Sequence, residues 1–136
     1  MNRRVFLTSL SAGTLLLACG CKPKAPYELA QIAGTVTYQG KPLDERFHIQ
    51  FVPSDGTRPS MGKLDEKGHY EAVHTLAQKG VKPGPCTIEI HWNANPNVTP
   101  VPDEYKELIA KYGFTGSDKI QVEIVGKDKK FDIDFK

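Results

Sequence analysis

Apolar and polar residues alternate with a period of two along seven short segments of the chain. In the segment 47–51, Phe47, Ile49 and Phe51 alternate with His48 and Gln50. Such alternation is typical of a β-strand with one buried face and one face in water. The same pattern recurs over the ranges 32–38, 61–64, 70–73, 86–92, 120–125 and 131–135. The sequence therefore predicts seven short strands.

Turn-forming residues separate these strands. Gly, Pro and Asp gather at 39–42, 65–68, 79–85 and 126–128, and each group favours a turn. Gly68 is expected to supply a positive φ in the second of them. The group at 126–128 is expected to join the last two strands as a hairpin.

One segment breaks the period of two. Tyr105, Leu108, Ile109 and Tyr112 recur at helical spacing, and Gly113 is placed to stop a helix. Together with the strands, this predicts an all-β fold: a seven-stranded antiparallel Greek-key β-sandwich with a short helix at about 103–112.

The first 18 residues have a different character. Residues 1–4 carry positive charge, and residues 5–18 form a mostly apolar stretch that is too short for an ordinary transmembrane helix. This pattern predicts a signal peptide over 1–18. Its end, Leu16-Leu17-Ala18-Cys19, resembles the bacterial lipobox. The resemblance implies cleavage after Ala18, a diacylglycerol on the Cys19 thiol and a further acyl chain on the new amino group.

The start of the signal peptide carries a second resemblance. Arg3 and Arg4, followed by Phe6 and Leu7, are similar to the twin-arginine export motif, which implies that the domain folds before export. A general-secretion signal that happens to hold two arginines is the alternative. Gly20 stands after the modified cysteine where an Asp would favour the inner membrane, so the outer membrane is favoured.

After the signal peptide, the sequence divides into a tether and a domain. Residues 19–29 contain two prolines and no apolar period, which predicts a flexible tether, and 30–136 form the β-sandwich domain. Once Cys19 is lipidated, Cys21 and Cys86 remain. Cys86 falls on the apolar face of its strand, which favours a buried free thiol, although a Cys21–Cys86 disulfide stays open in an oxidising compartment.

Charge argues against a nucleic-acid partner. The whole chain has 18 basic and 16 acidic residues. Arg3 and Arg4 leave with the signal peptide, which holds no acidic residue, so the mature chain is neutral. Because the basic excess belongs to the targeting segment, nucleic-acid binding is not expected.

Three motifs in order resemble the carboxypeptidase regulatory-like domain, a transthyretin-like β-sandwich found in lipoproteins of planctomycete type. They are Ile32-Ala33-Gly34-Thr35-Val36, the D-x-x-G-x-Y hairpin from Asp65 to Tyr70, and Val81-Lys82-Pro83-Gly84-Pro85-Cys86-Thr87-Ile88. Cys86 departs from the pattern, because an aromatic residue usually stands there. The resemblance implies the sandwich fold and a non-catalytic accessory role.

The chain shows no catalytic motif. There is no G-x-S-x-G, no H-E-x-x-H and no C-x-x-C, so no nucleophile elbow, metal site or cofactor is predicted. Two of the four histidines, His48 and His91, are expected to point outward from their strands, and His69 to sit at a turn. Asp and Glu residues are expected at turns, helix starts and exposed strand faces.

Trp92 and Tyr105 form the one candidate ligand rim. Aromatic rings at the end of a sandwich can stack on sugars, or they can close the open end of the core. The leading hypothesis is a membrane-anchored, non-enzymatic lipoprotein that acts as a structural or protein-interaction module of the cell envelope. The alternative is a surface lipoprotein that binds a carbohydrate or small ligand. The expected partners are the membrane, through the lipid on Cys19, and an envelope protein or a glycan.

Overall fold

The computed structural model describes residues 25–95, 97–127 and 129–136. Cys19, Cys21, Arg3 and Arg4 lie outside the described residues. The elements are β1 (Ile32–Tyr38), β2 (Lys41–Pro42), β3 (Phe47–Pro53), β4 (Ser60–Lys63), β5 (His69–Thr75), β6 (Gln78–Lys79), β7 (Gly84–Trp92), α1 (Asp103–Tyr112), β8 (Ile120–Ile124), β9 (Lys129–Lys130) and β10 (Ile133–Phe135). Within the described residues, no helix is long and apolar enough to cross a membrane.

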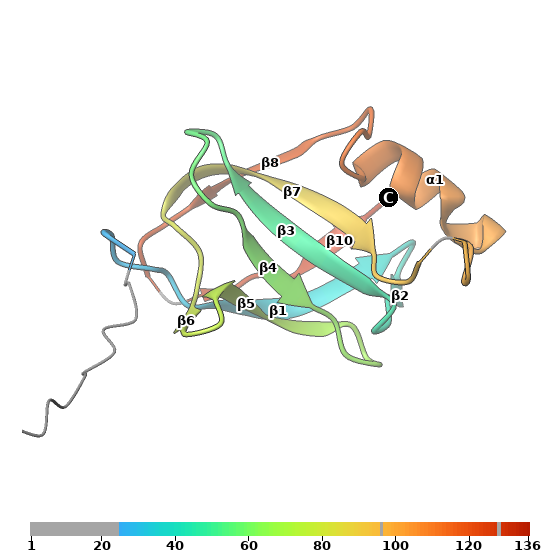
Figure 1. The fold of residues 1–136 in the computed structure, drawn as a ribbon, viewed down its shortest axis with the longest axis horizontal. Helices are drawn as coiled ribbons and strands as arrows, with labels where there is room; N and C mark the ends of the chain where they lie inside the picture. The colour runs from blue at the N-terminus through green and yellow to red at the C-terminus, as the bar shows by residue number, and fades with distance from the viewer. Residues whose placement is uncertain (1–24, 96, 128) are drawn as a thin grey trace, which may run out of the picture.

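The strands form a curled sheet that is mostly antiparallel (Figure 1). Seven strands follow one another in the order β10-β1-β5-β4-β3-β7-β8, with β2 and β9 beside β1 and β6 beside β5. Strands β3, β4 and β5 are neighbours in sequence and in space, and β7 returns to pair with β3. This order is a Greek key, so the predicted all-β fold is confirmed.

The core lies inside the curl of the sheet. Phe51 of β3 contacts Tyr70 of β5, with ring centroids 6.0 Å apart, and Phe131 at 6.4 Å. Phe47, Ile49 and Phe51 are buried, as the alternation predicted, and so are Cys86, Ile88 and Ile90 of β7. Contacts between apolar side chains of different strands therefore hold the two sides of the curl together.

Helix α1 has the bounds that the sequence predicts. Leu108 is buried in the core, while Tyr105, Ile109 and Tyr112 pack against its edge. The helix ends at Gly113, but not through a left-handed residue, because Gly113 has a φ of −70°. A Cβ at Gly113 would lie 2.5 Å from the carbonyl oxygen of Ile109. Glycine is needed there for a close approach of the backbone.

The turn at 65–68 is built as its residues predict. Gly68 has a φ of +77°, a conformation that glycine adopts at little cost. The Asp65 carboxylate accepts hydrogen bonds from the backbone N–H groups of Lys67 (2.8 Å) and His69 (2.9 Å). The Asp65 carboxylate thus stabilises the turn, and the positive φ of Gly68 allows the chain to reverse direction.

The predicted hairpin at 126–128 is wrong. Strand β8 pairs with β7, whereas β9 and β10 pair with β1, at the opposite end of the strand order. Both β9 and β10 run parallel to β1, an exception in a mostly antiparallel sheet. Alternation predicts strands over 120–125 and 131–135, and the structure has shorter ones there, β8 and β10. The pattern does not specify the strand with which each one pairs.

Gly34 explains how the C-terminal segment reaches β1. A Cβ built at Gly34 would stand 2.6 Å from the carbonyl carbon of Phe131 and closer still to its oxygen. The same carbonyl accepts a hydrogen bond from the Tyr70 hydroxyl (2.6 Å), and the Phe131 N–H donates to Ala33 (2.7 Å). The Phe131 backbone therefore occupies the space that any other side chain at position 34 would need.

The N-terminal segment contacts the domain before residue 30. The N–H of Ala25 donates to the side chain of Gln78 (3.0 Å), and the Tyr27 hydroxyl lies 3.2 Å from Nε2 of His74. The ammonium of Lys82 lies 4.8 Å above the Tyr27 ring. Residues 25–29 thus pack against β5, β6 and the segment before β7. The domain begins five residues earlier than residue 30, the start predicted from sequence.

We predict that Gly34→Ala lowers the free energy of unfolding by about 3 kcal/mol, because the added methyl group must displace the Phe131 backbone. Denaturant unfolding measures this change. The matched control is Ala33→Ser, an exposed neighbour on the same strand, for which a change within about 0.5 kcal/mol is expected. Equal stability of Gly34→Ala and the wild type would show that the C-terminal segment does not pack on β1 in this way.

Candidate functional site

The predicted rim residues Trp92 and Tyr105 lie together at the α1 end of the sandwich. Trp92 ends β7 and Tyr105 stands in the first turns of α1. Both rings pack edge-on against Phe47, with centroid separations of 5.0 Å. The two residues predicted from sequence to lie together are therefore close in the structure.

A guanidinium group already contacts both rings. The Arg46 Cζ atom lies 5.4 Å from the centroid of Trp92 and 5.6 Å from that of Tyr105, which is cation–π distance. Asp44 fixes the guanidinium with contacts of 2.9 Å to Nε and 2.6 Å to Nη2. This bond holds the pKa of Asp44 below its ordinary value. The guanidinium therefore already occupies ring surface on which a sugar would stack.

Trp92 also organises the loop that follows it. Its indole N–H donates to the carbonyl oxygen of Thr99 (3.0 Å), so the ring ties the loop before α1 to the end of β7. Packing against Phe47, contact with Arg46 and this hydrogen bond favour the interpretation that Trp92 and Tyr105 close the open end of the core.

A polar cluster on the outer face of β3 and β7 was not foreseen in full. His48 and His91 are register partners, as the predicted outward faces require, and their rings stack with centroids 5.0 Å apart. His48 bonds Asn93. Burial lowers the pKa of His48, and the charges of His91 and Lys63 act in the same direction, while the Asn93 bond opposes them.

Glu89 lies in this cluster and corrects a prediction. It was expected on the exposed face of β7, yet it is only 7% exposed. The Lys119 ammonium and the His91 ring cover it, at 3.5 Å and 3.2 Å from its carboxylate oxygens. The segment before β8 brings Lys119 over the sheet, and local alternation carries no signal for such a distant partner.

A serine and a histidine meet near the other end of the domain. The Ser60 hydroxyl lies 3.0 Å from Nδ1 of His74, the spacing of a nucleophile and its base. Ser60 is only 1% exposed, however, and Nε2 of His74 faces the Tyr27 hydroxyl. A substrate has no path to the Ser60 oxygen, so the three side chains form a hydrogen-bond chain that ties the N-terminal segment to β4 and β5.

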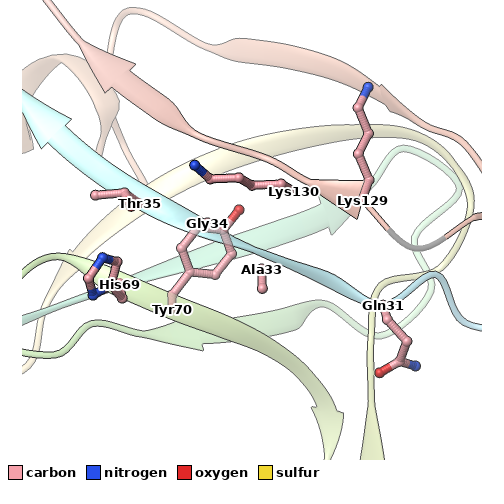
Figure 2. Close-up of a pocket in the computed structure, with 8 residues that line it drawn as sticks. All are labelled: Gln31, Ala33, Gly34, Thr35, His69, Tyr70, Lys129 and Lys130. Atoms are coloured by element: carbon pink, nitrogen blue, oxygen red, sulfur yellow. The ribbon is translucent and has the colours of Figure 1, made fainter.

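A shallow hollow of about 600 Å³ lies over β1 (Figure 2). Its lining residues are Gln31, Ala33, Gly34, Thr35, His69, Tyr70, Lys129 and Lys130. Its floor consists of small residues, and the Tyr70 hydroxyl is bonded to the Phe131 carbonyl. The Lys130 ammonium lies 3.3 Å from Asp132. The residues at the floor are small because the Phe131 backbone packs close to them. Their small side chains are enough to explain the depression, so it does not indicate a ligand.

The remaining candidate chemistry is limited. Cys86 is a buried free thiol, as predicted, and burial raises its pKa to about 11, so it is a poor nucleophile at neutral pH. In the part of the chain that the structure describes, no group of three or more His, Cys, Asp or Glu residues is placed to hold a metal ion.

Comparisons with known proteins assign no family to this chain. No family model matches the chain, and no curated protein matches it. A similar solved structure is that of a DUF3823 family protein from Parabacteroides merdae ATCC 43184, with 13% sequence identity and a TM-score of 0.44. The match covers 77% of this chain and 44% of that protein, so the chain spans less than half of its length. The resemblance to the carboxypeptidase regulatory-like domain stays a prediction.

We expect Trp92→Ala to lower the free energy of unfolding by about 2 kcal/mol, because it removes the contacts with Phe47 and Arg46 and the bond to Thr99. Phe114, which is exposed, gives the matched control, and Phe114→Ala is expected to change stability by about 0.5 kcal/mol or less.

A glycan array with the wild type and Trp92→Ala tests the other interpretation, that Trp92 and Tyr105 bind a sugar. A glycan that binds the wild type and not Trp92→Ala would establish the rim as a sugar site.

Acid should destabilise the fold through His48. Its pKa is lowered in the folded state, so below about pH 6.5 the unfolded chain binds a proton that the folded chain binds more weakly. Stability is therefore expected to fall as the pH drops below about 7.5 and toward the lowered pKa of folded His48, and His48→Gln should lessen this fall. Denaturant unfolding at several pH values measures the effect. Phe114→Ala, which removes an exposed side chain without charge, should leave the pH dependence unchanged. Wild-type stability that does not fall with acid would contradict the prediction.

Proposed function

We propose that the mature protein is a lipid-anchored β-sandwich of the cell envelope that acts as a structural or protein-interaction module. The observation that carries the proposal is Cys19 within Leu16-Leu17-Ala18-Cys19, directly after a positively charged and then apolar stretch. A signal peptide with this ending places a thiol where a lipoprotein carries its lipid. Two or more acyl chains anchor a protein stably, whereas one chain binds marginally.

The packing of the N-terminal segment supports an anchored domain. Ala25 is hydrogen-bonded to Gln78, and five residues lie between it and Cys19. Fully extended, the six Cα–Cα steps from Cys19 to Ala25 reach about 20 Å. A lipid on Cys19 would therefore hold the sandwich close to the bilayer, as suits a module that works at the membrane surface.

The opposite end of the sandwich offers a surface for a protein partner. Figure 1 shows α1 at the end away from the N-terminal segment. The exposed apolar side chains of Val98 and Phe114 precede and follow this helix. Contiguous exposed apolar side chains mark interaction surfaces, and we propose that Val98 and Phe114 belong to one. An envelope protein that approaches from the side away from the membrane would meet this end first.

Lipidation is tested by expressing the full-length chain in a Gram-negative host with labelled palmitate, followed by membrane fractionation and intact mass measurement. We expect the wild type to take up label and to remain with membranes, because Cys19 carries the lipid. Cys19→Ala should lose both properties. Cys21→Ala, two residues away, is the matched control and should behave as the wild type does.

The same fractionation tests the export route. If the twin-arginine system exports the protein, Arg3→Lys with Arg4→Lys should leave most of the precursor in the cytoplasm. Normal processing of this double variant would favour general secretion and would leave the anchor proposal intact. A wild-type protein that reaches the membrane without label would refute the anchor.

A further inference from the structure

Leu76 is fully exposed at the tip of the β5–β6 hairpin. It stands between Thr75, which ends β5, and Ala77, whose N–H is bonded to the Thr75 hydroxyl (3.2 Å). A leucine that projects from a tight turn contributes little to the core. Its side chain is therefore free to contact a surface outside the domain.

A groove of about 510 Å³ lies beside this tip. Its apolar lining comes from Pro59, Met61, Val73 and Leu76, and its charged lining from Arg58, Lys63 and Glu71. The Glu71 carboxylate is paired with Lys79, at 2.8 Å and 3.0 Å from its two oxygens. The groove thus combines apolar walls with an excess of positive charge.

The N-terminal segment packs next to this groove. His74 lines the groove, and its Nε2 atom lies 3.2 Å from the Tyr27 hydroxyl. Ala25 is bonded to Gln78, two residues beyond Leu76. Figure 1 shows β6 and the start of the described chain at one end of the molecule. The chain toward Cys19 therefore begins beside Leu76.

We propose that the β5–β6 tip and its groove dock onto the surface of an anionic phospholipid bilayer, with Leu76 inserted among the acyl chains and Arg58 and Lys63 at the phosphates. This inference rests on the proposed lipid anchor at Cys19. The five residues between Cys19 and Ala25 keep Ala25, which is bonded to Gln78 next to the tip, within about 20 Å of the lipid. An exposed leucine and two cations beside that attachment point match the apolar interior and the negative surface of such a membrane.

The charges favour a lipid surface over a protein partner at this end. Long arginine and lysine side chains can lay their apolar stems along a membrane and keep their charged groups at the phosphates. In sequence, Lys22 and Lys24 of the spacer add two further positive charges between the lipid-bearing residue and the domain. Each lysine or arginine near an anionic surface strengthens its attraction.

The test uses the mature lipidated protein, which begins at Cys19, reconstituted into vesicles of phosphatidylcholine and phosphatidylglycerol. The acyl chains carry bromine, a short-range quencher of tryptophan fluorescence. Leu76→Trp places a reporter at the tip. Val98→Trp, exposed at the α1 end, is the matched control, and the native Trp92 gives the same background in both. We expect quenching about twofold stronger for Leu76→Trp than for Val98→Trp, because only the tip reaches the acyl chains.

A second variant tests the role of charge. In the Leu76→Trp background, Arg58→Glu should weaken the quenching. Lys41→Glu, an exposed lysine of β2 at the other end, should not. Vesicles of phosphatidylcholine alone should reduce the quenching of Leu76→Trp in the same way as Arg58→Glu.

Flotation of the vesicles separates the two proposals. If the protein floats with the vesicles but Leu76→Trp is quenched no more than Val98→Trp, the anchor stands and the docking surface is refuted. If the wild type does not float, the anchor fails and the docking inference fails with it. A blue-shifted but unquenched Leu76→Trp would show that a second copy of the chain or another protein covers the tip, which also overturns the proposal.

Discussion

The carbonyl group of Phe131 packs against β1 where no side chain could stand. Gly34 leaves the space, and the Tyr70 hydroxyl supplies the hydrogen bond. This contact lets the chain return from β8, at one end of the strand order, to β9 and β10 at the other. The buried Phe135 of β10 thereby joins the core. Without the gap at Gly34, the C-terminal strands would lose their place beside β1, and one side of the curl would open.

Gly34 and Tyr70 belong to two motifs that are far apart in sequence, and the sequence alone does not show that they serve one contact. Alternation predicted the strands and helical spacing predicted α1, because both patterns report which side chains must be buried. Which strands pair with each other was harder to predict from the sequence. The strand at 131–135 follows a glycine-containing turn, which suggested a hairpin, but its partner is β1. A period of two specifies a buried face, and it says nothing about which edge a strand will join.

At the candidate site, too, local patterns predicted some features, while others depend on segments that are distant in sequence. Trp92 and Tyr105 could be brought together from sequence, since one ends a strand and the other begins a helix across a single loop. Arg46, which contacts both rings, carries no signal in its own neighbourhood. Glu89 was placed on the correct face of β7, but its burial depends on Lys119, thirty residues away. Burial of a polar side chain by a remote segment is a tertiary effect, and local patterns do not contain it.

The packing of residues 25–29 changes what an anchor at Cys19 could do. A flexible tether over 19–29 would let the domain move up to about 40 Å from the lipid and turn freely. With Ala25 and Tyr27 held against Gln78 and His74, the free length shortens to about 20 Å and begins at one defined end of the sandwich. Short attachment at one end restricts orientation as well as distance. If Cys19 carries the proposed lipid, the α1 end would point away from the membrane, and the same hydrogen bonds that complete the domain would also determine which surface a partner can reach.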